Sequence, residues 1–100
     1  MVYRQTIVSY DIEDNKTRTR LRKDLIALGL VPVQKSVLWG YLNATEEKAV
    51  LGVLGKLGLD KDDSPDSAFL VHADLETAIG KTTFGISRQL FLHPDDDRIV

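Results

Sequence analysis

The hydrophobic pattern of the chain begins with an extended segment at residues 3–10. β-Branched and aromatic side chains are frequent in it, and apolar side chains fall on both of its alternating faces. This pattern is typical of a strand that lies in the middle of a sheet. Asp11 follows directly, so the predicted strand carries one carboxylate at its C-terminal end.

A helix is predicted to follow this strand and to run to about Leu28. Asp14, with the asparagine after it, is a favourable helix cap. Leu21, Leu25 and Leu28 recur at the spacing of one helix face, which predicts the side that is buried. Gly29 predicts the end of the helix.

A second extended segment spans residues 31–42. Pro32 near its start suits the beginning of a strand, and Gly40 predicts a bulge or a tight bend. The segment therefore predicts either two short strands or one long bent strand.

A second helix is predicted after this segment. Thr45 is a candidate N-cap, and Glu46 and Glu47 lie in the first turn, where the helix dipole favours acidic residues. Gly58 predicts the end of the helix. Its apolar face consists of Val50, Val53, Leu54 and Leu57.

The last part of the chain adds a strand at residues 68–73 and a short strand at residues 88–92. The predicted architecture is the α+β ferredoxin-like βαββαβ fold with a short additional C-terminal strand. In this fold two helices cover one face of an antiparallel sheet. We expect one such domain at residues 1–92 and an exposed acidic C-terminal tail at residues 93–100.

Composition narrows the class of protein. One hundred residues with 43% hydrophobic content suffice for one core. The absence of cysteine excludes a disulfide framework, and no segment approaches the ~20 apolar residues of a membrane span, so we expect a cytoplasmic protein.

The net charge is −2, but the charge differs between the two halves of the chain. Residues 1–50 hold eight Lys or Arg and six acidic residues, whereas residues 51–100 hold five Lys or Arg and nine acidic residues. Positive charge is therefore local, as a phosphate-binding patch requires.

Asp11 and the arginines of the first predicted helix are the candidate functional residues. Arg18 and Arg22 are four residues apart and lie together on the helix, whereas Arg20 projects from another side. A carboxylate at a strand end is a candidate for chemistry, but such residues also serve in turns and caps. Likewise, a charged helix face is often only a solvated surface.

These residues also carry a resemblance to a known family. The tripeptide Tyr10-Asp11-Ile12, a helix that opens with Arg18 and Arg20, and Gly29 followed by Val-Gln-Lys-Ser-Val at residues 33–37 form one pattern. This pattern resembles the CRISPR-associated Cas-two (Cas2) family, the small ferredoxin-like proteins of the spacer-acquisition machinery. The resemblance covers roughly residues 3–45.

The resemblance implies roles for individual residues. It implies that Asp11 is the metal ligand and the catalytic residue of a homodimer, in which two Asp11 carboxylates share one Mg²⁺ ion. It implies nucleic-acid contact for Arg18 and Arg20, and we expect Arg22, which lies beside Arg18 on the helix, to share this role. It implies that three nearby polar residues shape the site, namely Tyr10, Gln34 and Ser36.

Two functional hypotheses follow from this reading. In the first, the protein is a Mg²⁺-dependent endonuclease that cleaves single-stranded RNA or duplex DNA at the dimer interface. In the second, it is a non-catalytic dimeric adapter that bridges Cas-one integrase subunits and binds incoming duplex DNA through its arginines. A toxin-like ribonuclease of the same fold and an unrelated ferredoxin-like regulatory module are weaker alternatives.

Overall fold

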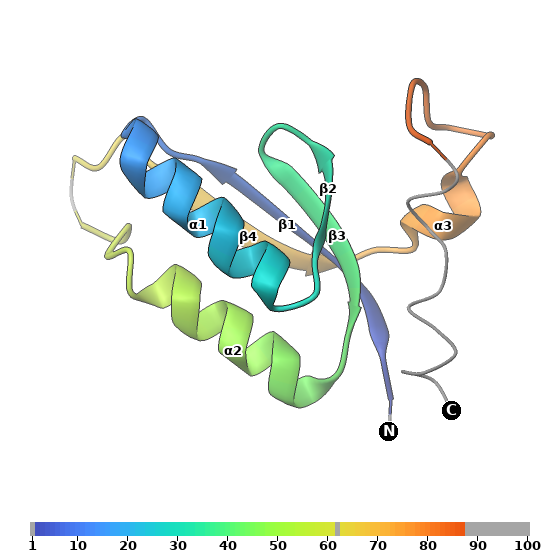
Figure 1. Cartoon of the computed structure of the whole chain (residues 1–100), viewed down its shortest axis with the longest axis horizontal. Coiled ribbons are helices and arrows are strands. Elements are labelled where there is room, and N and C mark those ends of the chain that lie inside the picture. Colours follow the sequence, from blue (N-terminus) through green and yellow to red (C-terminus); the bar gives the residue numbers. More distant parts are fainter. Residues whose placement is uncertain (1, 62, 88–100) are drawn as a thin grey trace.

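The structure, a computed structural model, describes residues 2–61 and 63–87 (Figure 1). Its elements are, in chain order, β1 (Arg4–Asp11), α1 (Asn15–Ala27), β2 (Val31–Gln34), β3 (Val37–Leu42), α2 (Ala44–Gly55), β4 (Ser67–His72) and α3 (Leu75–Ala78). The short strand expected at residues 88–92 and the tail at 93–100 lie outside the described residues, so the predicted domain boundary at residue 92 stays a prediction.

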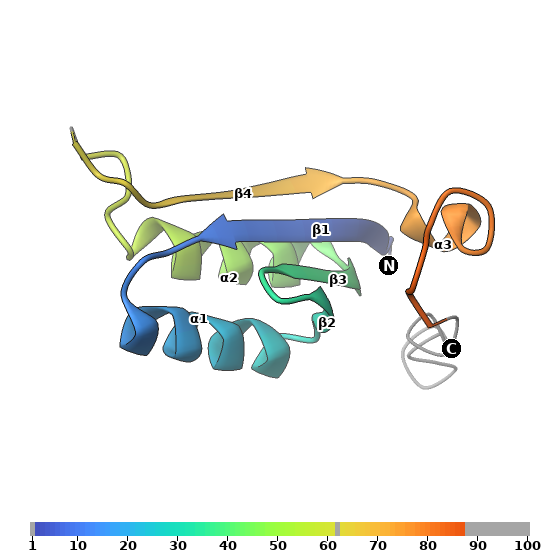
Figure 2. The same cartoon turned by 90° about the horizontal axis from the view of Figure 1, so that it is seen from above.

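The four strands form one antiparallel sheet in the order β2-β3-β1-β4. Figure 2 shows α1 and α2 on the same side of this sheet, which leaves the other face open to additional contacts. The ferredoxin-like prediction is confirmed, including the central place of β1 between β3 and β4. No helix in the described part of the chain is long and apolar enough to cross a membrane.

The main core lies between the sheet and the two long helices. Alternate residues of β1 point into it, and Val8 and Tyr10 are buried there. Leu21 and Leu25 of α1 pack against them, as the helix periodicity predicted, and Val50 contributes from α2. The alternation places the intervening residues of β1, which end with Asp11, toward the open face of the sheet.

The expected bulge or bend at Gly40 is wrong. Gly40 pairs regularly with Thr6, and the register shift lies instead in β2, between Pro32 and Gln34. A glycine is needed at position 40 for space, because a Cβ atom there would lie 3.0 Å from the carbonyl oxygen of Gly29. Of the two alternatives for residues 31–42, two short strands are correct, and Lys35 and Ser36 form the turn between them.

The expected N-cap of the second helix is also wrong by two residues. Asn43 caps α2, because its side chain accepts from the backbone N–H of Glu46 at 2.8 Å. The Glu46 side chain in turn accepts from the Asn43 N–H at 2.9 Å. This reciprocal pair satisfies two helix-end donors, whereas Thr45 could satisfy one. The helix ends at Gly55, and Gly58 terminates the turn after it with a φ of 64°.

A short helix that the sequence pattern did not predict, α3, covers part of the open sheet face. Trp39, which is 2% exposed, packs there with Ile79. The Gln5 side chain connects strand β3 to α3, since its Oε1 accepts from Trp39 Nε1 at 3.1 Å and from the Glu76 N–H at 2.9 Å. Burial and the neighbouring Glu76 carboxylate raise the pKa of Tyr41, whose hydroxyl donates to Glu76.

Candidate functional site

Asp11 lies exposed at the C-terminal end of β1, where the buried Tyr10 anchors the neighbouring hairpin. The backbone N–H of Tyr10 donates to the carbonyl oxygen of Ser36 at 3.0 Å, and its hydroxyl donates to the carbonyl oxygen of Lys35 at 3.4 Å. These bonds fix the β2–β3 turn beside the Asp11 carboxylate. Tyr10 and Ser36 are thus joined to each other beside Asp11, and their site-shaping roles stay predictions.

An open pocket of about 450 Å³ lies at this end of the sheet. It joins the end of β1, the first half of α1 and the β2–β3 turn, and its lining residues are Tyr10, Asp11, Ile12, Arg18, Thr19, Arg22, Lys35 and Ser36. One carboxylate and three cationic side chains thus surround the same space. Such a combination suits a ligand that carries phosphate groups.

Arg18 makes several hydrogen bonds within its own chain. Its Nη1 donates to the carbonyl oxygens of Ile12 at 2.8 Å and Glu13 at 3.3 Å, and its Nη2 donates to Asn15 Oδ1 at 2.7 Å. The guanidinium is therefore held against the connection between β1 and α1, which directly follows Asp11.

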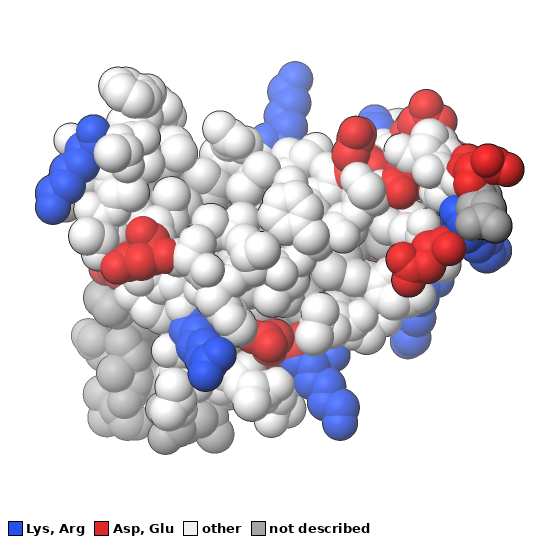
Figure 3. Space-filling view, turned by 180° about the vertical axis from the view of Figure 1, so that it is seen from behind, with Lys and Arg blue, Asp and Glu red and all other residues white. Residues whose placement is uncertain are grey.

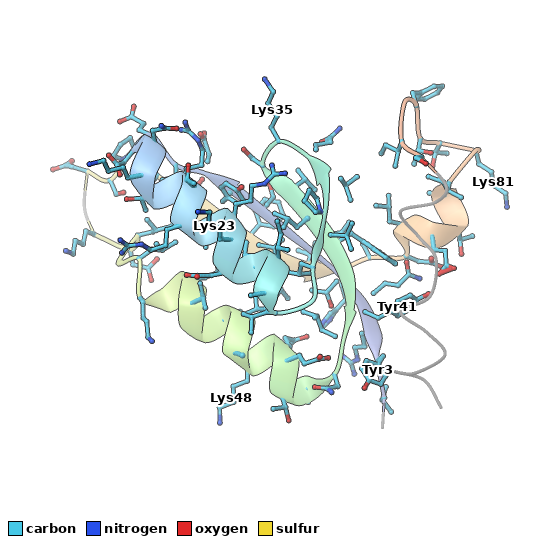
Figure 4. The ribbon with its side chains drawn as sticks, in the orientation of Figure 1. Tyr3, Lys23, Lys35, Tyr41, Lys48 and Lys81 are labelled. Atoms are coloured by element: carbon cyan, nitrogen blue, oxygen red, sulfur yellow. The ribbon has the colours of Figure 1, made fainter. Side chains whose placement is uncertain are left out.

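Arg22 and Lys35 differ from Arg18 in this respect. Both are exposed, and within residues 2–61 and 63–87 neither side chain has a hydrogen-bond or ion-pair partner. Figure 4 shows Lys35 at the tip of the β2–β3 hairpin, extending away from the body of the protein. Sequence reasoning missed Lys35 as a site residue. Its position between two extended segments was the available signal, because a hairpin there returns beside the central strand.

Two of the predicted site residues lie elsewhere. Arg20 lines a separate groove of about 240 Å³ between α1 and α2, together with Asp24 and Lys56. Gln34 is exposed at the end of β2 and does not line the Asp11 pocket. The structure thus brings Arg18 and Arg22 to Asp11 and separates Arg20 and Gln34 from it.

The start of α1 is fixed by hydrogen bonds to two acidic side chains. The hydroxyl and N–H of Thr17 donate to Asp14 Oδ2 at 2.7 and 2.8 Å, and they hold the pKa of Asp14 below its usual value. The Glu13 N–H donates to Asp66 Oδ1 at 2.8 Å, which ties the β1–α1 connection to the loop before β4. Asp66 was not predicted as part of this region, since it lies far along the chain.

The donor set tests whether a metal ion would fit. Magnesium takes one or two carboxylates and completes its octahedral shell with water and phosphate oxygens. Asp11 supplies one exposed carboxylate to the pocket, and the described residues contain no group of three or more His, Cys, Asp or Glu side chains that could hold an ion. One chain therefore supplies a single carboxylate ligand to this pocket, and any further ligands would have to come from water, phosphate or another chain.

Comparison with known proteins gives three findings. Residues 4–72 match the family model described as CRISPR associated protein Cas2. A segment of 47 residues is 53% identical to the CRISPR-associated endoribonuclease Cas2 1 of Francisella tularensis subsp. novicida (strain U112); the match covers 47% of this chain and about half, 48%, of that relative. The crystal structure of a hypothetical protein TT1823 from Thermus thermophilus is similar with a TM-score of 0.60 and 26% identity, over 72% of this chain and 83% of that chain.

Proposed function

Because this chain belongs to the CRISPR-associated protein Cas2 family, we propose that it acts in CRISPR spacer acquisition as a homodimeric, Mg²⁺-dependent endonuclease. The observation that carries this proposal is the exposed Asp11 carboxylate in a pocket that also holds Arg22 and Lys35, whose side chains have no partner among the residues that the structure describes. The similarity to a protein named an endoribonuclease supports RNA as the first substrate to test.

The residues of the pocket have different roles in the proposed reaction. Arg22 and Lys35 would bind phosphates of the nucleic-acid backbone and place a phosphodiester over Asp11. The two Asp11 carboxylates of a dimer would hold Mg²⁺, which supplies an activated water molecule and polarises the phosphodiester. Tyr10 and Ser36 keep the hairpin in place beside Asp11 through the bond from the Tyr10 N–H to the Ser36 carbonyl oxygen.

The open face of the sheet supports the dimeric part of the proposal. Figure 3, seen from behind with the β4 edge foremost, shows that charged side chains lie mainly at the periphery of this side of the molecule. Phe69 and Val71 of β4 are 54% and 43% exposed, and Asp11 shares their side of the sheet because it pairs with Ser67 two residues before Phe69. Burial of this surface against a second copy would remove exposed apolar area from water.

The test compares the parent protein with Asp11→Asn, which removes the charge and keeps the size of the side chain. Both are incubated with single-stranded RNA and with duplex DNA, in Mg²⁺ or in EDTA, and light scattering checks that both are dimers. We expect cleavage by the parent in Mg²⁺ only, and a loss of about 100-fold or more in Asp11→Asn. Asp60→Asn, in the exposed connection after α2, is the matched control and should cleave normally.

A second function is favoured by a different observation. The Asp11 pocket of one chain is lined by a single acidic residue and three cationic residues. Cationic side chains alone suffice to bind a phosphate backbone. In this alternative the dimer is an adapter that binds duplex DNA and bridges Cas-one integrase subunits. Cleavage that is absent, or equal in the parent and Asp11→Asn, together with normal DNA binding by both, would replace the endonuclease with this adapter.

A further inference from the structure

The three cations of the Asp11 pocket are not equivalent. We propose that Arg18 is a positioning residue, which holds the β1–α1 connection that presents Asp11, and that Arg22 and Lys35 alone make the phosphate contacts in this pocket. This inference rests on the proposed function, because it assigns roles within the same nucleic-acid site. It separates two arginines that the sequence placed together on one side of a helix.

The hydrogen bonds of Arg18 carry the first part of the argument. Ile12 directly follows Asp11 and is buried, and its carbonyl oxygen accepts from Arg18 Nη1 at 2.8 Å. Asn15 is the first residue of α1, and its side chain accepts from Arg18 Nη2 at 2.7 Å. One guanidinium therefore connects the end of β1 to the first turn of α1. A guanidinium can do this because its donors form a rigid fork, whereas a lysine ammonium is a single point.

The other side-chain hydrogen bonds of the β1–α1 connection involve backbone N–H groups, whereas those of Arg18 include backbone carbonyl oxygens. Asp14 and Asp66 accept from backbone N–H groups, those of Thr17 and Glu13. Arg18 instead donates to the carbonyl oxygens of Ile12 and Glu13. Without Arg18 these two carbonyl oxygens would lose their side-chain donor, and the residues that follow Asp11 would be held from one side only.

Arg22 and Lys35, unlike Arg18, are placed to contact phosphate groups. Arg22 lies one helical turn beyond Arg18, and Lys35 lies on the β2–β3 turn, so these two lining residues come from two different elements. Both side chains are exposed and have no protein partner in the described part of the chain. All of their donors are therefore available for phosphate oxygens, whereas three of the five N–H donors of Arg18 are already engaged within its own chain.

The first experiment measures the dependence of duplex DNA affinity on salt concentration. Each phosphate contact contributes about 0.9 to the slope of log affinity against log salt. We expect Arg22→Ala and Lys35→Ala each to lower the slope by about 0.9 for every protomer that contacts the duplex, and Arg18→Ala and Arg18→Lys to leave it unchanged. Lys48→Ala, on the exposed side of α2 (Figure 4), is the control for loss of a cation outside the pocket.

The second experiment measures amide hydrogen exchange at Glu13, whose N–H lies in the β1–α1 connection. Arg18→Ala and Arg18→Lys should accelerate it by about tenfold, since charged hydrogen bonds of this kind stabilise by roughly 1.5 kcal/mol or more. Arg22→Ala should leave it unchanged, and Val8, in the buried centre of β1, serves as an internal reference for global stability.

Two results would overturn the inference. One is a lower salt slope in Arg18→Ala that Arg18→Lys restores, because lysine replaces the charge and not the fork. The other is unchanged exchange at Glu13 in both Arg18 variants. If the parent protein binds neither RNA nor DNA, the proposed function fails and the phosphate assignment fails with it, while the exchange measurement still decides whether Arg18 holds the connection.

Discussion

At the scale of single residues, Gly40 and Gly52 differ in the space that a side chain would have at each position. A Cβ atom at position 40 would lie 3.0 Å from the Gly29 carbonyl oxygen and 3.1 Å from Leu30 Cδ2. The strand β3 and the end of α1 can approach each other this closely only because residue 40 has no side chain. At position 52, within α2, an added Cβ atom would meet nothing within 4 Å.

Gly40→Ala should therefore lower the free energy of unfolding. The added methyl group must displace backbone atoms as well as the Leu30 side chain, and overpacking of this kind costs about 1–3 kcal/mol. Urea unfolding followed by circular dichroism measures the change.

Gly52→Ala is the matched control and should raise the free energy of unfolding by about 0.5–1 kcal/mol, because alanine favours the helix over glycine and has free space here. Equal effects of the two substitutions would contradict the steric role of Gly40.

At the scale of the elements, the start of α1 decides where the candidate site residues lie. Asp14 begins the helix three residues after Asp11, and from there each arginine takes its place on the helix surface. Arg18 and Arg22 reach the Asp11 pocket, while Arg20 faces the groove against α2. A change in the position of this cap by one residue would rotate the arginines by about 100° around the helix axis.

The cap also predicts a pH dependence of stability. The folded state lowers the pKa of Asp14 through its bonds from Thr17, so ionised Asp14 stabilises the fold above the unfolded pKa of about 4, and this stabilisation is lost as the pH falls through the lower folded pKa. Asp14→Asn keeps an acceptor and removes the titration.

The difference in urea midpoint between the parent and Asp14→Asn should therefore be larger near about pH 6 than near about pH 2.5. Asp74, which caps α3 in the same way, is present in both proteins and so does not contribute to the difference. A difference that stays constant with pH would show that the charge of Asp14 is not responsible.

At the scale of the whole molecule, the two faces of the sheet differ in how completely they are covered. The helices α1 and α2 bury one face, while α3 covers Trp39 and Ile7 on the other and leaves Phe69 and Val71 exposed. The uncovered part of this face includes the end of β1 that carries Asp11. Self-association through it would place a second Asp11 near the first if the two-fold axis passes close to this end of β1.

Val71→Lys should weaken self-association. Burial of a charged ammonium in an apolar contact is unfavourable, and we expect the dimer dissociation constant to rise by about tenfold or more. Sedimentation equilibrium measures it.

Ile26→Lys is a matched control, because Ile26 is also 43% exposed but lies on α1. Equal weakening by both substitutions, or by neither, would exclude the open face of the sheet as the dimer surface.

Much of the fold could be predicted from the chain because its signals are local. The leucines of α1 repeat with the helix period, and the Asp14 cap lies next to the residues it caps. The misplaced cap of α2 is a local error between two nearby candidates, Asn43 and Thr45. The other errors concern residues whose role depends on distant partners. Gly40 is explained by its contact with Gly29, and α3 is held by Gln5 and Trp39, which lie far from it in the chain.

By itself, then, the sequence determined the succession of elements from β1 to β4, the buried side of α1 and the carboxylate at the end of β1, since periodicity acts between near neighbours. Only the tertiary structure decided which cations share a pocket with Asp11. Lys35 reaches it through the β2–β3 hairpin, and Arg18 turns its donors to the carbonyl oxygens of Ile12 and Glu13. The reason is that the contacts available to a side chain depend on which elements the fold brings beside it.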